Sequence, residues 1–489
     1  MQGDRRRGIA LLIGVPLTAV LAAAVTISPR AILVLPAALA LVLVVRFSWA
    51  RAAFFMLGAF LVFQTSSGLS TPKVFYFAVV ALSVLVSLAR LRRISHDPVI
   101  HNLKPAYLGG LGIILWQLLF VLPYSVGVRG VSVENWLRDG ATYVLIGCAV
   151  IIAMDAVSST STRLARGLVI AVGTVAAFSF ASRWISARGL VGAADTDGDA
   201  TLLSSLTALT LAVALAFTLA LAGTRLRWLW LLLGVVFVLA ILVTGTRTGV
   251  VFGAVLVGIV GSRVKMRAPV RRVLAGAGIG VAAVAAAIPI TASFFTNEDF
   301  LTQRLTSIWS TIQNGVGSDQ SGAIRGRAYE YCLQIWQQHL LLGRGEGWAF
   351  VNPTTGVLGS DFSVDSPLVY LAKFGIVGCL VLATCLVSIF VPLIRRGRSS
   401  NWLLENTAVR GCAAILLALL PFGATLEDKG FGITIALAVL LVGSAMRAQR
   451  RDVSDLLATS EGSQQTLAAP TEALGNADRA PVVDLPGRA

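Results

Sequence analysis

The chain consists of long apolar runs separated by short polar gaps, and this pattern covers most of its 489 residues. A bilayer core of about 30 Å is crossed by roughly 20 apolar residues in a helix. Lipid offers no partner to backbone amides and carbonyls, so such runs are expected to be helices. The pattern predicts an all-α, polytopic transmembrane bundle of about fourteen spans, within a range of about 12–14. The expected spans are 8–27, 31–45, 52–68, 74–89, 106–123, 140–155, 167–183, 200–222, 228–243, 248–262, 273–295, 366–393, 408–424 and 430–446.

The polar gaps differ in charge, and the difference alternates along the chain. One set of gaps carries clustered arginines, as at 90–93 and 447–451, whereas the short gaps of the other set carry single cations such as Arg30 and Lys429. Clustered Lys and Arg residues remain on the cytoplasmic side of a membrane. We therefore expect both termini in the cytoplasm. Arg5 to Arg7 before the first run also fit a secretory signal, but the run is long enough to span, and we interpret it as an uncleaved first helix.

Composition agrees with the membrane class. Hydrophobic residues make up 56% of the chain and charged residues only 13%, with a mean hydropathy of +0.80; soluble domains average about 25% charged residues. The net charge of +16 would favour nucleic acid in a soluble protein. Here the basic residues lie between apolar runs, where they set topology and contact anionic headgroups, so we expect membrane lipids and no nucleic acid as partners. The five cysteines show no metal-binding spacing, and we expect neither a metal nor a cofactor.

These patterns divide the chain into four parts. Residues 1–295 form an N-terminal bundle of about eleven spans, and 296–365 form one large extracytoplasmic loop with short helices. Residues 366–450 form the C-terminal spans. Residues 451–489 lose the apolar pattern and predict a disordered cytoplasmic tail.

The large loop contains a helical pattern, and loops of this length are usually functional or disordered. Tyr331, Ile335 and Trp336, with Leu340 and Leu342, fall near one face of a helix over 327–342. This spacing predicts an amphipathic helix that lies on the membrane surface. The glycines of 343–347 end that helix and allow close approach of the backbone to a ligand.

The expected outer face carries arginines, whose planar fork suits bidentate contact with phosphate. Each of them could equally contact lipid headgroups. Arg247 stands apart because it lies at the end of two short spans, where an arginine is usually paired or functional. The candidates are Arg247, Arg304, Arg325, Arg327 and Arg344.

Acidic candidates lie just before the apolar run that begins near Ser366. Asp365, or Asp361 as second choice, could accept a proton from a sugar hydroxyl. Asp365 also fits a helix cap, because Ser366 and Pro367 follow it. Lys373 is an intramembrane cation and is expected to pair with a carboxylate or a phosphate. His339 is a further secondary candidate.

Three segments together resemble the O-antigen ligase and O-antigen polymerase superfamily of bacterial membrane glycosyltransferases. Residues 244–249 (TGTRTG) are similar to its signature of an arginine that opens a span. Residues 325–331 (RGRAYEY), leading into 338–345 (QHLLLGRG), resemble its arginine-bearing loop, and 365–378 (DSPLVYLAKFGIVG) resembles the following span. These motifs cover about a quarter of the chain, and their order and spacing carry the likeness.

The chain also departs from the family pattern. Val364 stands where the ligases have a histidine, and Asp365 falls at the adjacent asparagine. Leu340 replaces the loop proline, and either Arg325 or Arg327 can match the family arginine. The missing histidine favours the polymerases over the ligases.

The resemblance implies a fold similar to the GT-C-type membrane glycosyltransferases and a metal-independent, inverting transfer at the outer face of the bacterial cytoplasmic membrane. The donor would be a polyprenyl-diphosphate-linked oligosaccharide, and the acceptor the end sugar of another lipid-linked repeat unit. Arg247, Arg325 or Arg327, and Arg344 would bind the diphosphate, with Asp365, Arg247 and Arg327 as the catalytic set. A glycan chain-length regulator is a further expected partner.

Two alternatives remain open. A ligase would use the same groups to move finished glycan to a lipid or protein. A lipid-linked sugar flippase would need polar residues through the midplane and often internal repeats; the midplanes here are mostly Leu, Val, Ala and Gly.

Overall fold

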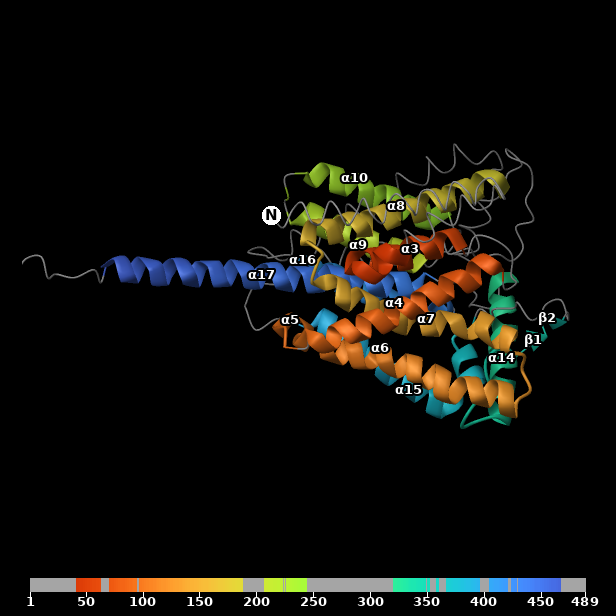
Figure 1. Cartoon of the computed structure of the whole chain (residues 1–489). Coiled ribbons are helices and arrows are strands. Elements are labelled where there is room, and N and C mark those ends of the chain that lie inside the picture. Colours follow the sequence, from red (N-terminus) through yellow and green to blue (C-terminus); the bar gives the residue numbers. More distant parts are fainter. Residues whose placement is uncertain are drawn as a thin grey trace, which may run out of the picture.

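The computed structural model of the protein is an all-α bundle with one two-stranded hairpin (Figure 1). It describes residues 41–62, 70–94, 96–187, 206–222, 224, 226–243, 320–348, 350–351, 358–359, 366–395, 404–420, 424–428 and 430–467. The elements are α3 (Ser48–Val62), α4 (Thr71–Arg93), α5 (Pro98–Asn102), α6 (Lys104–Trp116), the π-helices η2 (Gln117–Val121) and η3 (Pro123–Val128), α7 (Val133–Val157), α8 (Thr162–Ala187), α9 (Leu206–Leu221), α10 (Arg227–Val243), α14 (Gln320–Gln338), β1 (Phe350–Val351), β2 (Leu358–Gly359), α15 (Val369–Ile394), α16 (Leu404–Leu419), the 3-10 helix η7 (Thr425–Glu427) and α17 (Phe431–Leu467).

Within the described residues, six helices are long and apolar enough to cross a membrane. They are Thr71–Arg93, Lys104–Val128, Val133–Val157, Thr162–Phe180, Val369–Ile394 and the first part of α17, and α9 and α10 are shorter apolar helices. The expectation of a helical membrane protein is thus confirmed. The expected spans from 52–68 to 228–243 and from 366–393 to 430–446 each overlap a helix. Those at 8–27, 248–262 and 273–295 lie outside the described residues, and of 31–45 only 41–45 is described, as helix.

The C-terminal helix differs from the expectation of a disordered tail from residue 451, because α17 continues to Leu467 and extends well past the bundle (Figure 1). A helix already nucleated in the bundle adds residues at little further cost, since only nucleation is unfavourable. Between Arg451 and Leu467 the sequence contains no proline, which would end a helix.

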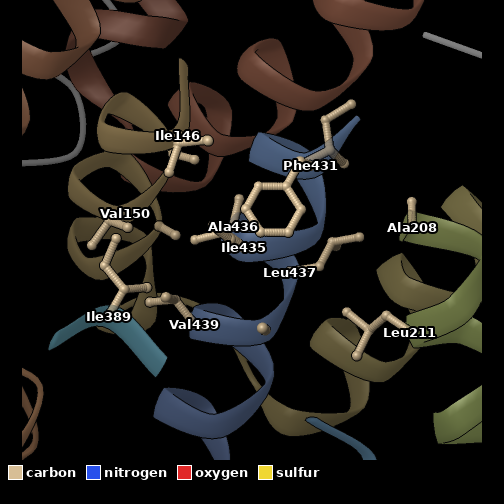
Figure 2. Close-up of a cluster of buried hydrophobic side chains, with 14 of the residues drawn as sticks. Ile146, Val150, Ala208, Leu211, Ile389, Phe431, Ile435, Ala436, Leu437 and Val439 are labelled. Atoms are coloured by element: carbon tan, nitrogen blue, oxygen red, sulfur yellow. The ribbon is translucent and has the colours of Figure 1, made fainter. Parts of the chain in front are cut away.

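The centre of the bundle is formed by α7 and α17. Nearly all residues of α7 from Gly140 to Val157 are buried, and α17 is buried over most of its apolar part. Figure 2 shows side chains of α17, among them Phe431 and Leu437, between Ile146 of α7 and Leu211 of α9. The charged residues of the two central helices therefore lie near the ends of their buried apolar stretches, where polar sites can form.

Small residues let neighbouring helices approach closely, as is common between helices in membranes. A Cβ added at Gly147 of α7 would lie 2.5 Å from the carbonyl oxygen of Gly110 of α6. One added at Gly109 would lie 2.5 Å from the carbonyl oxygen of Cys385 of α15. These contacts hold α6 between α7 and α15, which fixes the π-helical end of α6 beside the site described below.

The two ends of the bundle differ in what they carry (Figure 1). At one end lie α14, β1 and β2; we call it the loop end. The opposite end carries ion pairs of arginines that belong to the basic gaps of the sequence. Arg51 pairs with Asp155 with both side chains fully buried, and Arg90 Nε lies 3.6 Å from Asp155 Oδ1. Arg447 pairs there with Asp97.

Candidate functional site

The segment from His339 to Trp348, which we call the latch loop, follows α14 at the loop end and is bound to α15 through the backbone. The amides of Arg344 and Gly345 donate to the carbonyls of Ala372 and Lys373 at 2.8 and 2.9 Å. In return, the amides of residues 376 and 377 donate to the carbonyls of residues 340 and 341 at 3.0 and 3.1 Å. This exchange is possible because α15 is interrupted at Gly375, whose φ of 62° leaves neighbouring backbone groups outside the helical pattern.

The glycines of the latch loop fit close against the bundle. Gly343, Gly345 and Gly347 have φ values of 70°, 96° and 74°, a region that side chains disfavour. A Cβ on Gly343 would overlap the backbone of Lys373, and one on Gly347 would lie 2.5 Å from the amide nitrogen of Trp136. The close approach of Gly343 and Gly347 is thus to the backbones of α15 and α7, and that of Gly345 is to Ser125 of η3. Approach of this segment to a ligand stays a prediction.

A buried ion cluster lies directly beneath the latch loop. Lys373 Nζ of α15 is 2.5 Å from Asp139 Oδ1 of α7 and 2.6 Å from Glu427 Oε1 of η7. Asp139 Oδ2 accepts a hydrogen bond of 2.9 Å from the amide of Gly347. The hydroxyl of Tyr143 donates to Glu427 Oε1 at 3.2 Å. The cluster therefore joins three elements and the latch loop, and Lys373 pairs with carboxylates, one of the two kinds of partner expected from the sequence.

Glu346 is the latch-loop side chain that enters the bundle. It is fully buried, and its Oε1 accepts a hydrogen bond of 3.0 Å from Gln117 Nε2. Its amide donates to Ser125 Oγ at 3.0 Å. Both partners belong to the π-helical end of α6, and π-helical turns are frequent at functional sites. Burial, followed by the nearby Asp139 carboxylate, raises the pKa of Glu346 well above its usual value.

Three basic side chains meet on the outward side of the latch loop; we call Arg129, His339 and Arg344 the basic cluster. Arg129 Nη2 lies 3.3 Å from His339 Nδ1 and donates to the carbonyl of Gly343 at 3.2 Å. Burial, then the charges of Arg129 and Arg344, lowers the pKa of His339 below its usual value. A neutral imidazole that accepts at Nδ1 carries its proton on Nε2, where it can donate to a ligand.

Aromatic rings hold the two guanidinium groups in place. Arg344 lies over the ring of Trp348 at 3.5 Å, and Trp348 stacks on Tyr331 of α14 with ring centroids 6.5 Å apart. Arg129 donates to the hydroxyl of Tyr124 at 2.6 Å. Neither arginine forms an ion pair with a carboxylate in the described part of the chain. Two such guanidinium groups and an imidazole N–H are the donors that phosphate oxygens require.

The structure describes only some of the residues expected from the sequence. Arg247, Arg304, Asp361 and Asp365 lie outside the described residues. Arg344 and His339 lie together in the basic cluster, and Lys373 lies in the ion cluster beneath it.

The two loop arginines of the family motif both lie on α14. Arg327 is exposed there and forms no hydrogen bond or ion pair among the described residues, so the structure does not bring it to the basic cluster. For Arg325 only the position on the helix is described.

The contacts of α14 correct a further expectation. The helix ends at Gln338 and its buried residues are Ala328, Cys332 and Ile335, which belong to the core that α14 shares with α15. Positions i, i+4 and i+7 form one helical face, and the bundle covers it, whereas the sequence pattern placed such a face on the membrane surface. Leu340 follows the helix and is 48% exposed.

Several polar residues of the site were missed in the sequence. The sequence does not single out Arg129, which shares the gap at 124–139 with Arg138, or Glu427, which Asp428 follows directly. Asp139 offered a better signal, because α7 begins at Val133, capped by Ser132, and so an acid stands within a spanning helix. Glu346 was visible in the glycine-rich segment, but nothing local indicated that it enters the bundle.

No protein-family model and no curated protein matches the sequence. The described residues thus define a class, an all-α membrane protein with a basic cluster and a buried ion cluster at one end of its bundle. A function for this chain has to be inferred from that site and from the motifs of its sequence.

Proposed function

We propose that the protein is a polysaccharide polymerase of the cytoplasmic membrane. It transfers glycan from a polyprenyl-diphosphate-linked donor to the end sugar of another lipid-linked repeat unit. The observation that carries this proposal is the basic cluster, where Arg129, His339 and Arg344 present donors without a carboxylate partner among the described residues. The order of the three sequence motifs supports it, because Arg344 and Lys373 each belong to one of them.

In the proposed topology, the loop end faces the outside of the membrane and both termini lie in the cytoplasm. The ion pairs of Arg51, Arg90 and Arg447 at the opposite end agree with the rule that clustered basic residues stay inside. The bundle would contain about fourteen spans, in an arrangement similar to the GT-C-type glycosyltransferases. Lipid-linked donors could then enter from the outer leaflet.

The reaction joins two sugars and releases a diphosphate. The oxygen of the acceptor hydroxyl attacks the anomeric carbon of the donor, and the bond from that carbon to the phosphate oxygen breaks with inversion. The electron pair leaves with the polyprenyl diphosphate, whose charge Arg129 and Arg344 neutralise together with Arg247 and one of Arg325 and Arg327. The hydroxyl proton passes to a carboxylate, for which Asp365 is the candidate and Asp361 the second choice.

The ion cluster supports this chemistry from below. Lys373 binds Asp139 and Glu427, so its charge is already used inside the protein and is assigned to support of the latch loop. The amide of Gly347 donates a hydrogen bond to Asp139. This bond holds the part of the latch loop that carries Arg344 against the bundle. Other surfaces of the protein would select the sugars and the linkage. A regulator of chain length would also bind outside the ion cluster.

The test is the length of the glycan in cells of the source organism that lack the gene and carry a plasmid copy. Arg344→Ala and Arg129→Ala are expected to shorten the glycan to single repeat units, with unchanged protein level. Arg92→Ala is the matched control, because Arg92 is exposed on α4 and lies outside the site. Normal chain length in both site variants would overturn the proposal. Polymer that is long but not attached to its final acceptor would indicate a ligase, and loss of lipid-linked units from the outer leaflet a flippase.

A further inference from the structure

Glu346 has an unusual setting for a carboxyl group. The latch loop donates its amides from Arg344 to Gly347 to the bundle, and Glu346 is the one side chain of this stretch that is fully buried. Before Glu346 in the chain, the side chain of Arg344 lies over the ring of Trp348. After it, the amide of Gly347 donates to Asp139. The way Glu346 is held is therefore connected, through two peptide units, to the backbone that carries Arg344.

Three buried polar atoms around Glu346 lack a hydrogen-bond partner in the described part of the chain: Glu346 Oε2, Gln117 Oε1 and Trp136 Nε1. Gln117 and Glu346 are already joined through the other atom of each group, Nε2 to Oε1, at 3.0 Å. An ionised carboxylate offers acceptors only, so it could use the indole N–H but would leave Gln117 Oε1 without a donor. A carboxylic acid has the missing donor: its O–H can donate to Gln117 Oε1, and its oxygen can still accept from Trp136.

Glu346 Oε2 lies close against the backbone of α7 at Gly140. A Cβ added at Gly140 would lie 2.5 Å from Glu346 Oε2 and 3.3 Å from Trp136 Nε1, so the carboxyl group fills the space above this glycine. A buried polar group without a partner costs about 1–3 kcal/mol, and more when it is charged. The arrangement therefore favours the form that satisfies all three atoms.

The charged groups around Glu346 come from α7, η7 and α15. Asp139 of α7 and Glu427 of η7 oppose a negative charge there, and Lys373 of α15 favours one. Lys373 is held between these two carboxylates, at 2.5 and 2.6 Å. The π-helical end of α6 contributes the neutral Gln117 and Ser125. An ionised Glu346 would therefore be a third carboxylate beside Lys373, with no further cation among the described groups that act on it.

The geometry points to Glu346 as a protonated positioning residue that pairs with Gln117 as acid with amide and holds Arg344 and His339 in the arrangement that binds a diphosphate. This inference rests on the proposed function for its ligand. When Glu346 loses its proton, the acid–amide pair is lost, the latch loop leaves the bundle, and the basic cluster comes apart. Binding of diphosphate and protonation of Glu346 then favour each other.

The experiment uses the full chain in detergent and inorganic diphosphate as the probe, with binding measured by calorimetry. Glu346→Gln keeps a neutral amide at the same place and is expected to bind diphosphate as wild type does at mildly acidic pH. Glu346→Leu and Gln117→Leu are expected to bind much more weakly, and Gln334→Leu, on the exposed face of α14, is the matched control. Affinity of Glu346→Gln as weak as that of Glu346→Leu, or wild-type affinity in Glu346→Leu, would overturn the inference.

A pH series separates positioning from a general structural role. Above the pKa of Glu346, the apparent dissociation constant of wild type should rise about tenfold per pH unit, because only the protonated fraction is competent. His339 and the diphosphate titrate in the Glu346→Gln experiment as well. The difference in pH dependence of the dissociation constant between wild type and Glu346→Gln therefore reports on Glu346. The infrared difference spectrum of wild type against Glu346→Gln at neutral pH should show the carbonyl band of a protonated carboxyl. An ionised carboxylate in that spectrum contradicts the inference even if Glu346→Leu or Gln117→Leu fails to fold.

The two proposals fail in different ways. If wild type binds no diphosphate but the infrared band is present, the proposed ligand is wrong and the positioning inference falls with it, while Glu346 is still shown to be protonated. If wild type binds diphosphate and all variants bind equally, the basic cluster stands and the positioning role of Glu346 is wrong.

Discussion

Lys373 Nζ lies 2.5 Å from Asp139 Oδ1, which ties the loop-end part of α15 to the first turns of α7. The two residues are far apart in sequence and meet beneath the latch loop, where Asp139 also accepts the amide of Gly347. This single relationship links the bundle interior to the segment that carries Arg344. The predictions below separate its structural role from the binding role of the basic cluster.

Lys373→Met should destabilise the protein strongly. The variant leaves Asp139 and Glu427 buried without their cation, and breaking a buried ion pair by removal of one partner typically costs about 3–5 kcal/mol. The measurement is thermal unfolding of the full chain in detergent. Lys104→Met, at an exposed position on α6, is the control and should change little. An equal shift in both variants would show that the ion cluster contributes no stability.

Gly343→Ala should disrupt the latch loop. Alanine at a φ of 70° costs about 1–2 kcal/mol, and its Cβ would in addition overlap the backbone of Lys373. Limited proteolysis should therefore cut the segment 339–348 faster in the variant. Gly167→Ala is the matched control, because nothing lies within 4 Å of a Cβ there, and alanine is favoured over glycine in a helix by about 1 kcal/mol. Equal cleavage in the two variants would contradict the described loop geometry.

Stability should depend on pH through Glu346. Its pKa is raised in the folded protein, so the folded state binds more protons than the unfolded state. The free energy of unfolding therefore falls as pH rises from the unfolded-state pKa, about 4.3, to the raised folded value, and levels off above it. Thermal unfolding of wild type across pH should show this decline, and Glu346→Gln should show a flatter curve. A steeper decline in Glu346→Gln would be inconsistent with a raised pKa.

The opposite end of the bundle should matter for stability and not for diphosphate. Asp155→Asn leaves the fully buried Arg51 without its carboxylate and should cost about 3–5 kcal/mol. The double variant Arg51→Met with Asp155→Leu should recover part of this loss, because it leaves no buried charge. The folded fraction of each variant should bind inorganic diphosphate with wild-type affinity. Weaker binding in the folded double variant would mean that the two ends are coupled.

The sequence predicted the helices well where one physical signal dominates. Runs of apolar residues such as those in α4, α7 and α15 exceed the thickness of a bilayer core, and no other structure satisfies their backbones there. Helix ends were less predictable: α7 begins before the apolar run because Ser132 caps it, and α17 continues after its apolar run. Capping and helix propagation depend on a few polar residues that hydrophobic periodicity does not detect.

The site was only partly predictable, because it depends on pairs of residues distant in the chain. Arg344, His339 and Lys373 were found as cations near expected span ends. Arg129 and Asp139 acquire their roles from contacts with segments more than 200 positions further along the chain. The glycines of the latch loop are predictable from the sequence as sites of close approach, but their partners are not. Gly343 meets the backbone of α15 near the break at Gly375, and Gly347 meets the backbone at the start of α7.

The most direct test is glycan extension by the purified full chain in proteoliposomes that contain lipid-linked repeat units from the source organism. Wild type should convert these units into a ladder of longer glycans, and Arg344→Ala should leave them as single units while Arg92→Ala behaves as wild type. A wild-type protein that produces no ladder, or an Arg344→Ala variant that produces the same ladder, would contradict the assignment of the basic cluster to a polysaccharide polymerase.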